Sequence, residues 1–147
     1  MDISDGAEHL GAALTNNHSL TELNISINTI GDTGAAALGD ALGNNKALIT
    51  LVMVGCRIFS EGCAALAAGL SYPQYYKLYS NDVGVEGAVA LGEALAHNKT
   101  LKILNLCGDE SLQEEGVNSL IASLISNTTL QQLWLTCRSQ IGVVVIR

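Results

Sequence analysis

An internal repeat constrains the fold of this chain more than any other feature. Residues 6–20 and residues 34–48 are related by a shift of 28 positions. The residues that recur are Gly6, Leu10, Gly11, Leu14, Asn16, Asn17 and Leu20. A single unit of this length cannot bury its own apolar face, so repeated units stack and share a core. We therefore expect a row of similar units rather than one central core.

The start of each unit has the pattern of a short strand. In residues 20–31, LTELNISINTIG, Leu23 and Ile25 keep the two-residue period of a strand with one buried face. Asn28 follows, where its amide can bond nearby backbone groups in a turn. The same skeleton returns as Leu48, Leu51, Met53, Cys56 and Ile58, then as Leu101, Leu104 and Leu106, and again as Leu130, Leu133 and Leu135.

The second half of each unit has the spacing of a helix. Ala35, Leu38 and Leu42 lie on one helical face, and small residues allow the helices of adjacent units to approach closely. Residues 43–45, Gly-Asn-Asn, are expected to end the helix in left-handed backbone, which Gly and Asn tolerate. The units predict an α/β solenoid that is curved, with a parallel sheet on the concave side and helices on the convex side.

The chain is expected to form one domain. Its units are a partial N-terminal unit at 1–19, units at 20–47, 48–72, 73–100 and 101–129, and a truncated unit at 130–147. Solenoids carry polar caps at their ends, whereas the pattern of this chain starts inside a helix and stops without a final helix. We therefore expect a fragment or a truncated gene product.

Two regions depart from the repeat. Relative to the other units, three residues are missing from the segment before Asn81. In the preferred register Tyr76 and Leu78 point inward, and Pro73 begins the strand, where a missing N–H does little harm. Further on, residues 107–116 carry one extra residue in the turn, residues 136–142 read as a distorted turn, and residues 143–147 form an apolar tail.

Charge and cysteine content narrow the classes of function. The net charge of −7 argues against nucleic acid and anionic membrane as partners, and no apolar stretch is long enough for membrane insertion. The four cysteines form no C-x-x-C pair and no signal peptide opens the chain, so we expect reduced thiols in a cytoplasmic protein. The N-x-S/T triplets are attributed to the repeat and not to glycosylation; they begin at Asn17, Asn24, Asn98 and Asn127.

Catalytic and ligand chemistry find little support. His9, His18 and His97 fall at helix or helix-exit positions and lack metal-ligand spacing with Cys or Asp, so we expect surface positions. The acidic residues near position 110 are expected to form a solvated loop without the alternating spacing of a calcium site; they are Asp109, Glu110, Glu114 and Glu115. We predict no catalytic residue, no metal site and no cofactor.

The repeat combines L-x-x-L-x-L-x-x-N/C-x-I-G with E-G-A-x-x-L-x-x-A-L, and residues 85–95 are the best copy of the second half. Over residues 3–135 this pattern resembles the ribonuclease-inhibitor class of leucine-rich repeats. Cys56 occupies the position of Asn28 and Asn81, and that family accepts either residue type. Helix exits such as residues 98–101, Asn-Lys-Thr-Leu, look most like the repeat region of a NOD-like receptor, while the nucleotide-binding motif G-x-x-x-x-G-K-[ST] is absent.

Side chains that alternate with the inward leucines are expected to line the concave wall. Nothing in the repeat requires apolar or aromatic residues on this wall, so the apolar and aromatic side chains among them resemble interface anchors. Alternatively, Trp134 packs beneath the tail at 143–146, and the tyrosines only fill the irregular third unit. The predicted partner-binding residues are Glu22, Asn24, Ser26, Thr50, Val52, Val54, Tyr75, Lys77, Tyr79, Ile103, Asn105, Gln132 and Trp134.

The resemblance implies recognition of a protein by the concave face, without a reaction, as part of a NOD-like-receptor-type sensor. Two alternatives stay open. One is an inhibitor of a basic enzyme, which the charge of −7 favours. The other is a Ran-type GTPase activator, which would act on a bound GTPase through loop residues. The sequence does not indicate which protein is bound.

Overall fold

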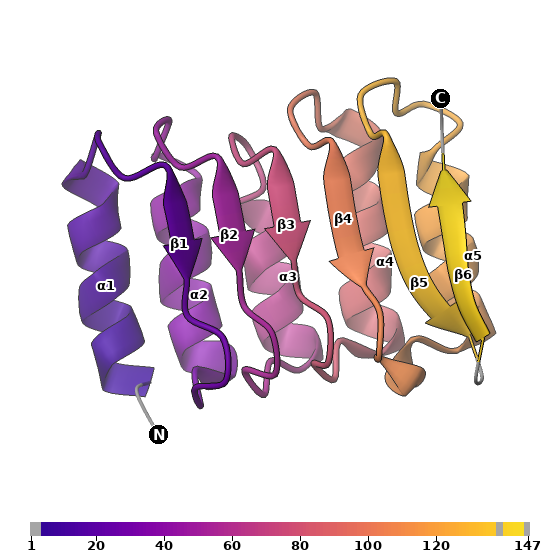
Figure 1. Ribbon diagram of the computed structural model, residues 1–147, viewed down its shortest axis with the longest axis horizontal. Helices are drawn as coiled ribbons and strands as arrows, with labels where there is room; N and C mark the ends of the chain where they lie inside the picture. The colour runs from indigo at the N-terminus through magenta and orange to yellow at the C-terminus, as the bar shows by residue number, and fades with distance from the viewer. Residues whose placement is uncertain (1–3, 138–139, 146–147) are drawn as a thin grey trace.

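The molecule consists of a layer of strands and a layer of helices, built from a row of stacked units (Figure 1). A computed structural model describes the backbone of residues 4–137 and 140–145 and the side chains of residues 6–135. Helices and strands alternate along the chain as the repeat predicts. The helices are spread more widely than the strands, so the strand layer lies on the concave side (Figure 1). The predicted solenoid is confirmed.

The strands form one six-stranded sheet whose order follows the sequence. The first five strands pair in parallel, because a helix carries the chain back between one strand and the next. β6 pairs antiparallel with β5. The strands are β1 (Glu22–Asn24), β2 (Thr50–Val52), β3 (Tyr75–Lys77), β4 (Ile103–Leu106), β5 (Gln132–Cys137) and β6 (Gln140–Val145).

The helices lie side by side behind the sheet (Figure 1). They are α1 (Ser4–Asn16), α2 (Gly31–Leu42), α3 (Ser60–Ala68), α4 (Gly84–His97) and α5 (Gln113–Ser123). A short 3-10 helix, η1 (Glu110–Leu112), precedes α5 at the turn that carries the extra residue.

Small residues allow the helices to pack closely. A Cβ atom added to Gly39 would lie 2.4 Å from the carbonyl oxygen of Ala65 on the next helix. One added to Gly11 would lie 2.6 Å from the carbonyl oxygen of Ala37. A side chain at either position would push the two helices apart, and the strands would then lose their spacing.

The core lies between the two layers. Leu51 and Met53 enter it from β2 and its extension, and Leu38, Leu66 and Leu91 enter it from the helices; all five are fully buried. Because the strand residues alternate between this core and the outer face, the two-residue period predicted from the sequence is confirmed.

The irregular third unit keeps the predicted register. Tyr76 is paired with Leu51 on one side and Leu104 on the other, and its side chain is fully buried. The prediction that Pro73 begins the strand is wrong, since β3 begins at Tyr75. The first bond of this rung is donated by the N–H of Gln74, so Pro73 lies just before the ladder, where its missing N–H removes no bond.

Left-handed backbone occurs after the strands and not where the sequence predicted it. Gly43, which follows α2, has a φ of −60°, so the expected left-handed helix exit is wrong. The equivalent residues after β1 to β4 instead all have positive φ: Ile27 (58°), Gly55 (60°), Ser80 (57°) and Gly108 (71°). This conformation disfavours L-residues with branched side chains, so Ile27 is the strained member of the set.

The C-terminal region is more regular than predicted. The distorted turn expected at 136–142 is wrong, because β5 continues through Cys137 and β6 begins at Gln140. Trp134 is paired with Val143 across the two strands. The connecting residues 138–139 and the last two residues of the expected tail, 146–147, lie outside the described residues.

Candidate functional site: the strand face

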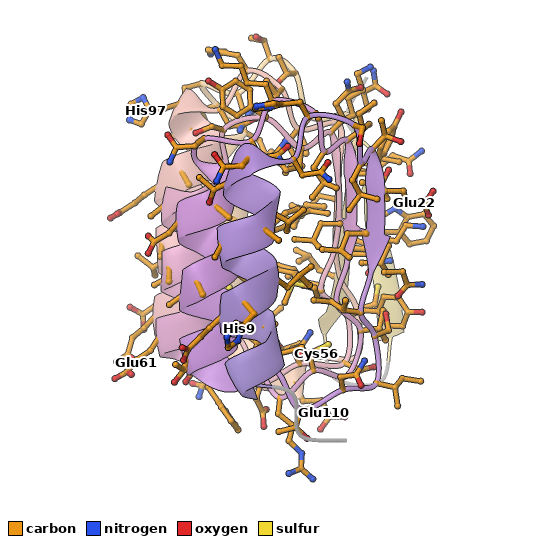
Figure 2. The ribbon with its side chains drawn as sticks, turned by 90° about the vertical axis from the view of Figure 1, so that its left-hand side faces the viewer. His9, Glu22, Cys56, Glu61, His97 and Glu110 are labelled. Carbon is orange, nitrogen blue, oxygen red and sulfur yellow. The ribbon has the colours of Figure 1, made fainter. Side chains whose placement is uncertain are left out.

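The side chains that alternate with the buried ones form one surface on the outer side of the sheet, here called the strand face. Figure 2 shows Glu22 on this side and Glu61 on the opposite, helix side. The parallel register aligns the strand face in rows across the sheet. The first row is Glu22, Thr50, Tyr75, Ile103 and Gln132, the second is Asn24, Val52, Lys77, Asn105 and Trp134, and the third is Ser26, Val54, Tyr79 and Cys107.

The middle of the strand face is apolar and aromatic. Tyr79 is 38% exposed, and Val52, Val54 and Tyr75 are half-buried. These side chains have not entered the core between the layers, and they rest on a sheet whose backbone is already hydrogen-bonded. Rigid aromatic and aliphatic side chains of this kind serve as anchors in protein interfaces.

Polar residues at the edges of the strand face are held by local bonds. Asn24 accepts hydrogen bonds from the N–H and the hydroxyl of Ser26, and Ser26 in turn accepts the N–H of Val54 at 3.1 Å. The indole N–H of Trp134 donates to Gln132 at 3.1 Å. The Trp134 side chain is half-buried, and its polar atom is hydrogen-bonded to a neighbour on the same face.

The strand face carries almost no net charge. Glu22 and Lys77 are the charged residues among those in its three rows. Several acidic residues lie instead in the first turns of the helices, where the positive end of the helix dipole favours them; these are Asp32, Glu61, Glu86, Glu114 and Glu115. The net charge of −7 thus arises outside the three rows and does not describe the strand face.

Beneath the strand face, one buried amide ties the third unit to the second. Asn81 donates to the carbonyl oxygens of Met53 at 2.7 Å and Leu78 at 2.6 Å. Its own oxygen accepts the N–H groups of Cys56 at 2.9 Å and Ile58 at 3.2 Å. The turn after β2 is therefore fixed by a side chain from the unit that follows.

Asp109 holds the same position in the next unit, and the prediction that it lies in a solvated loop is wrong. Its side chain is 1% exposed, and it accepts the N–H of Val83 at 2.7 Å and both the N–H and the hydroxyl of Ser111. Asp109 follows Leu106 by three residues, just as Asn81 follows Leu78, so the repeat spacing could have identified it. Burial raises the pKa of the Asp109 carboxyl, while these hydrogen bonds oppose the rise.

Buried asparagines at the helix exits form a second set of ties. Asn127 donates to the carbonyl oxygens of Leu95 at 2.7 Å and Asn98 at 3.1 Å, and its oxygen accepts the N–H groups of Thr129 and Leu130. Asn45 and Asn98 make similar bonds in their units. The N-x-S/T triplets at Asn98 and Asn127 therefore serve the backbone, as expected.

The thiols that the structure describes show no sign of activation. Cys56 and Cys63 are buried and free, and burial raises the pKa of both thiols, so each stays protonated. Cys107 is half-buried and free on the strand face. The predicted free thiols are confirmed for these three residues.

The described residues offer neither a metal site nor a membrane-spanning helix. His9, His18 and His97 are exposed, as predicted. Within the described residues, no three His, Cys, Asp or Glu side chains come together so that they could hold a metal ion. Among the helices described, none combines the length and the apolar character needed to cross a bilayer.

The repeat geometry agrees with the comparison to known families. Residues 16–39 match the family described as Leucine Rich repeat. The chain is a leucine-rich-repeat protein. Its fold is shared with the structure titled Leiomodin-1 Actin-Binding Site 2, at a TM-score of 0.76 and 22% identity, over 94% of this chain and 80% of that one. At this identity the likeness shows the fold alone.

Sequence relatives add a second observation. The chain is 32% identical to NACHT, LRR and PYD domains-containing protein 12 of Mus musculus over 88% of the chain. It is 35% identical to NACHT, LRR and PYD domains-containing protein 13 of Homo sapiens over 87% of the chain. It spans only 13% and 10% of these relatives. This leucine-rich-repeat chain is therefore similar to the repeat region of NOD-like receptors, which supports a protein-interaction module.

Proposed function

We propose that the strand face recognises a protein partner as part of a NOD-like-receptor-type sensor, without catalysing a reaction. The observation that carries this proposal is the aligned second row of the sheet, in which Val52 on β2, Lys77 on β3 and Trp134 on β5 are held in fixed register. Side chains on a sheet held this rigidly lose little conformational entropy on binding. The cytoplasm is the proposed location, supported by the free thiols of Cys56 and Cys63.

The charge distribution favours a partner with an apolar contact surface. Glu22 and Lys77 balance each other on the strand face, so attraction between charges on this face and a partner contributes little. The binding constant is therefore expected to change by less than about threefold between about 0.05 and 0.5 M salt, although salt screens exposed charges much more strongly at the higher concentration. The inhibitor alternative relied on the charge of −7, which arises outside the three rows of the strand face. Neither that alternative nor the GTPase activator is favoured by an observation.

Capture from cell extract with matched variants tests the proposal. Val52→Glu combined with Trp134→Ala alters the strand face, and Ala12→Glu adds the same charge to an exposed position on α1. Circular dichroism first establishes that both variants are folded. We expect the Ala12→Glu variant to capture the same proteins as the wild type and the strand-face variant to lose them. Equal capture by all three chains would refute the proposal.

A further inference from the structure

The connection between α3 and β3 is shorter than the corresponding connections elsewhere in the stack. From Leu42 on α2 to Leu51, the inward residue of β2, the chain advances nine positions. From Leu70, the equivalent residue after α3, to Tyr76 on β3 it advances six. Pro73 therefore stands where the other helix exits carry an asparagine. The three missing residues leave this exit without the loop that the other units place there.

A cavity of about 430 Å³, here called the exit notch, lies at this short connection between the ends of α3 and α4. Its buried lining is apolar, since Ala67 and Leu70 are only 4% and 5% exposed. Its exposed lining is polar and basic and includes Ser71, His97 and Lys99. Both α3 and α4 have a helix on either side, so the exit notch belongs to the middle of the row and not to its ends.

Hydrogen bonds join the two walls of the exit notch. The side-chain amide of Asn98 donates to the carbonyl oxygen of Leu70 at 2.6 Å, and the hydroxyl of Thr100 donates to that of Ser71 at 3.0 Å. The side-chain oxygen of Asn98 accepts the N–H groups of Thr100 and Leu101. The exit notch is therefore formed before a ligand arrives, and binding there requires little ordering of the chain.

The edge of the molecule that holds the exit notch is basic, although the chain carries a net charge of −7. Within residues 6–135, the connections that lead from a helix to a strand contain no Asp or Glu. The charged residues of these connections are Lys46, Lys99 and Lys102. Figure 2 shows His97 at this end of the helices and Glu61 at the opposite end. Glu93, one turn before His97 on α4, is not part of the notch lining.

The helix ends at this edge repel an anion less than helix C-termini normally do. Unpaired carbonyl oxygens give a helix C-terminus its partial negative charge. Here the amide of Asn98 takes up the carbonyl oxygen of Leu70, and the amide of Asn127 takes up that of Leu95. The exposed ammonium group of Lys99 therefore dominates the charge beside the exit notch.

We propose that the exit notch binds an acidic segment of a protein partner. A small aliphatic side chain of that segment enters between α3 and α4 and covers Ala67 and Leu70. Flanking carboxylates lie against Lys99 and accept hydrogen bonds from its ammonium group. This contact lies away from the strand face and depends on charge, so it goes beyond the recognition proposed for that face.

Titration of the isotope-labelled chain with a short peptide, followed by amide NMR shifts, tests the proposal. The probe is Glu-Glu-Val-Glu-Glu, and its control is Gln-Gln-Val-Gln-Gln. We expect the acidic peptide to bind with a Kd of about 0.1–1 mM and to shift the amides of Lys99 and Thr100. The control should bind about tenfold more weakly, and raising salt from about 0.05 to 0.5 M should weaken the acidic peptide about tenfold. Equal binding of both peptides, or no shift at Lys99 and Thr100 up to about 5 mM peptide, would overturn the proposal.

Three variants separate the exit notch from general attraction between charges. Lys99→Glu reverses the charge beside the notch, and Ala68→Leu narrows the notch without changing any charge; each should weaken the acidic peptide about tenfold. Arg57→Glu is the matched control, because Arg57 is exposed in the turn after β2, at the opposite edge, and its binding should change less than about twofold. Circular dichroism establishes that all three are folded. Unchanged binding by Lys99→Glu or Ala68→Leu, or an equal loss in Arg57→Glu, would refute the assignment.

Discussion

Replacing Ile27 by Gly is expected to stabilise the protein, although it removes a large apolar side chain. Ile27 has a φ of 58° and is 81% exposed, so its side chain contributes little burial and its backbone is strained. Left-handed backbone costs an L-residue about 1–2 kcal/mol. The added freedom of Gly in the unfolded chain opposes this by about 0.5–1 kcal/mol. The net expected gain is about 0.5–1 kcal/mol.

Urea unfolding followed by circular dichroism measures this gain. With a slope of about 1–3 kcal/mol per M, the unfolding midpoint should rise by about 0.4 M. Ile27→Ala separates backbone strain from side-chain size, since Ala keeps the unfavourable φ, and it should be less stable than Ile27→Gly. Ala12→Gly, in the middle of α1, should instead lower stability by about 0.5–1 kcal/mol. If Ile27→Gly proves less stable than Ile27→Ala, the account of strain after β1 is wrong.

Three further changes test the core, the helix contacts and the buried acid by the same unfolding measurement. Tyr76→Phe removes a buried hydroxyl that has no hydrogen-bond partner among the described residues, and should raise stability by about 1 kcal/mol; a loss would contradict this. Gly39→Ala should cost about 1–3 kcal/mol because of its 2.4 Å approach to Ala65, whereas Gly43→Ala, with its nearest atom at 3.6 Å, should be tolerated; equal effects would refute the packing argument. Asp109 has a raised pKa in the folded state, so the native carboxyl binds its proton more tightly than the unfolded one, and the associated stability is lost as pH rises above the ordinary value of about 3.9. The stability of Asp109→Asn relative to the wild type should therefore increase from pH 4 to pH 7, and a constant difference would exclude this role.

The architecture was predictable because each unit repeats the same physical solution. The strand period set by Leu51 and Met53, and the helical face set by Leu38 and Leu42, both follow from burial on one side of an element. Even the shortened third unit kept its register, since Tyr76 had to fill a leucine position in the core. Alternation then places the strand face without further information.

The errors arose where one side chain could satisfy the backbone in more than one way. An asparagine after a helix suggested left-handed backbone, whereas Asn45 bonds the preceding unit with its amide and leaves the backbone right-handed nearby. Asp109 was expected to be solvated because its sequence neighbours are acidic, whereas its spacing from Leu106 indicates a buried position in the turn after the strand. β6 was missed because pairing with β5 depends on long-range geometry that the repeat does not encode.

A site-specific photo-cross-linking measurement tests the central proposal most directly, namely that the strand face contacts the partner. A photoreactive phenylalanine analogue is introduced either at the position of Val52 on the strand face or at that of Glu61 on the helix side, which is shown in Figure 2. Both chains are exposed to the same cell extract and irradiated. We predict a covalent adduct with a protein from position 52 and none from position 61. An adduct from position 61 alone would contradict the proposal.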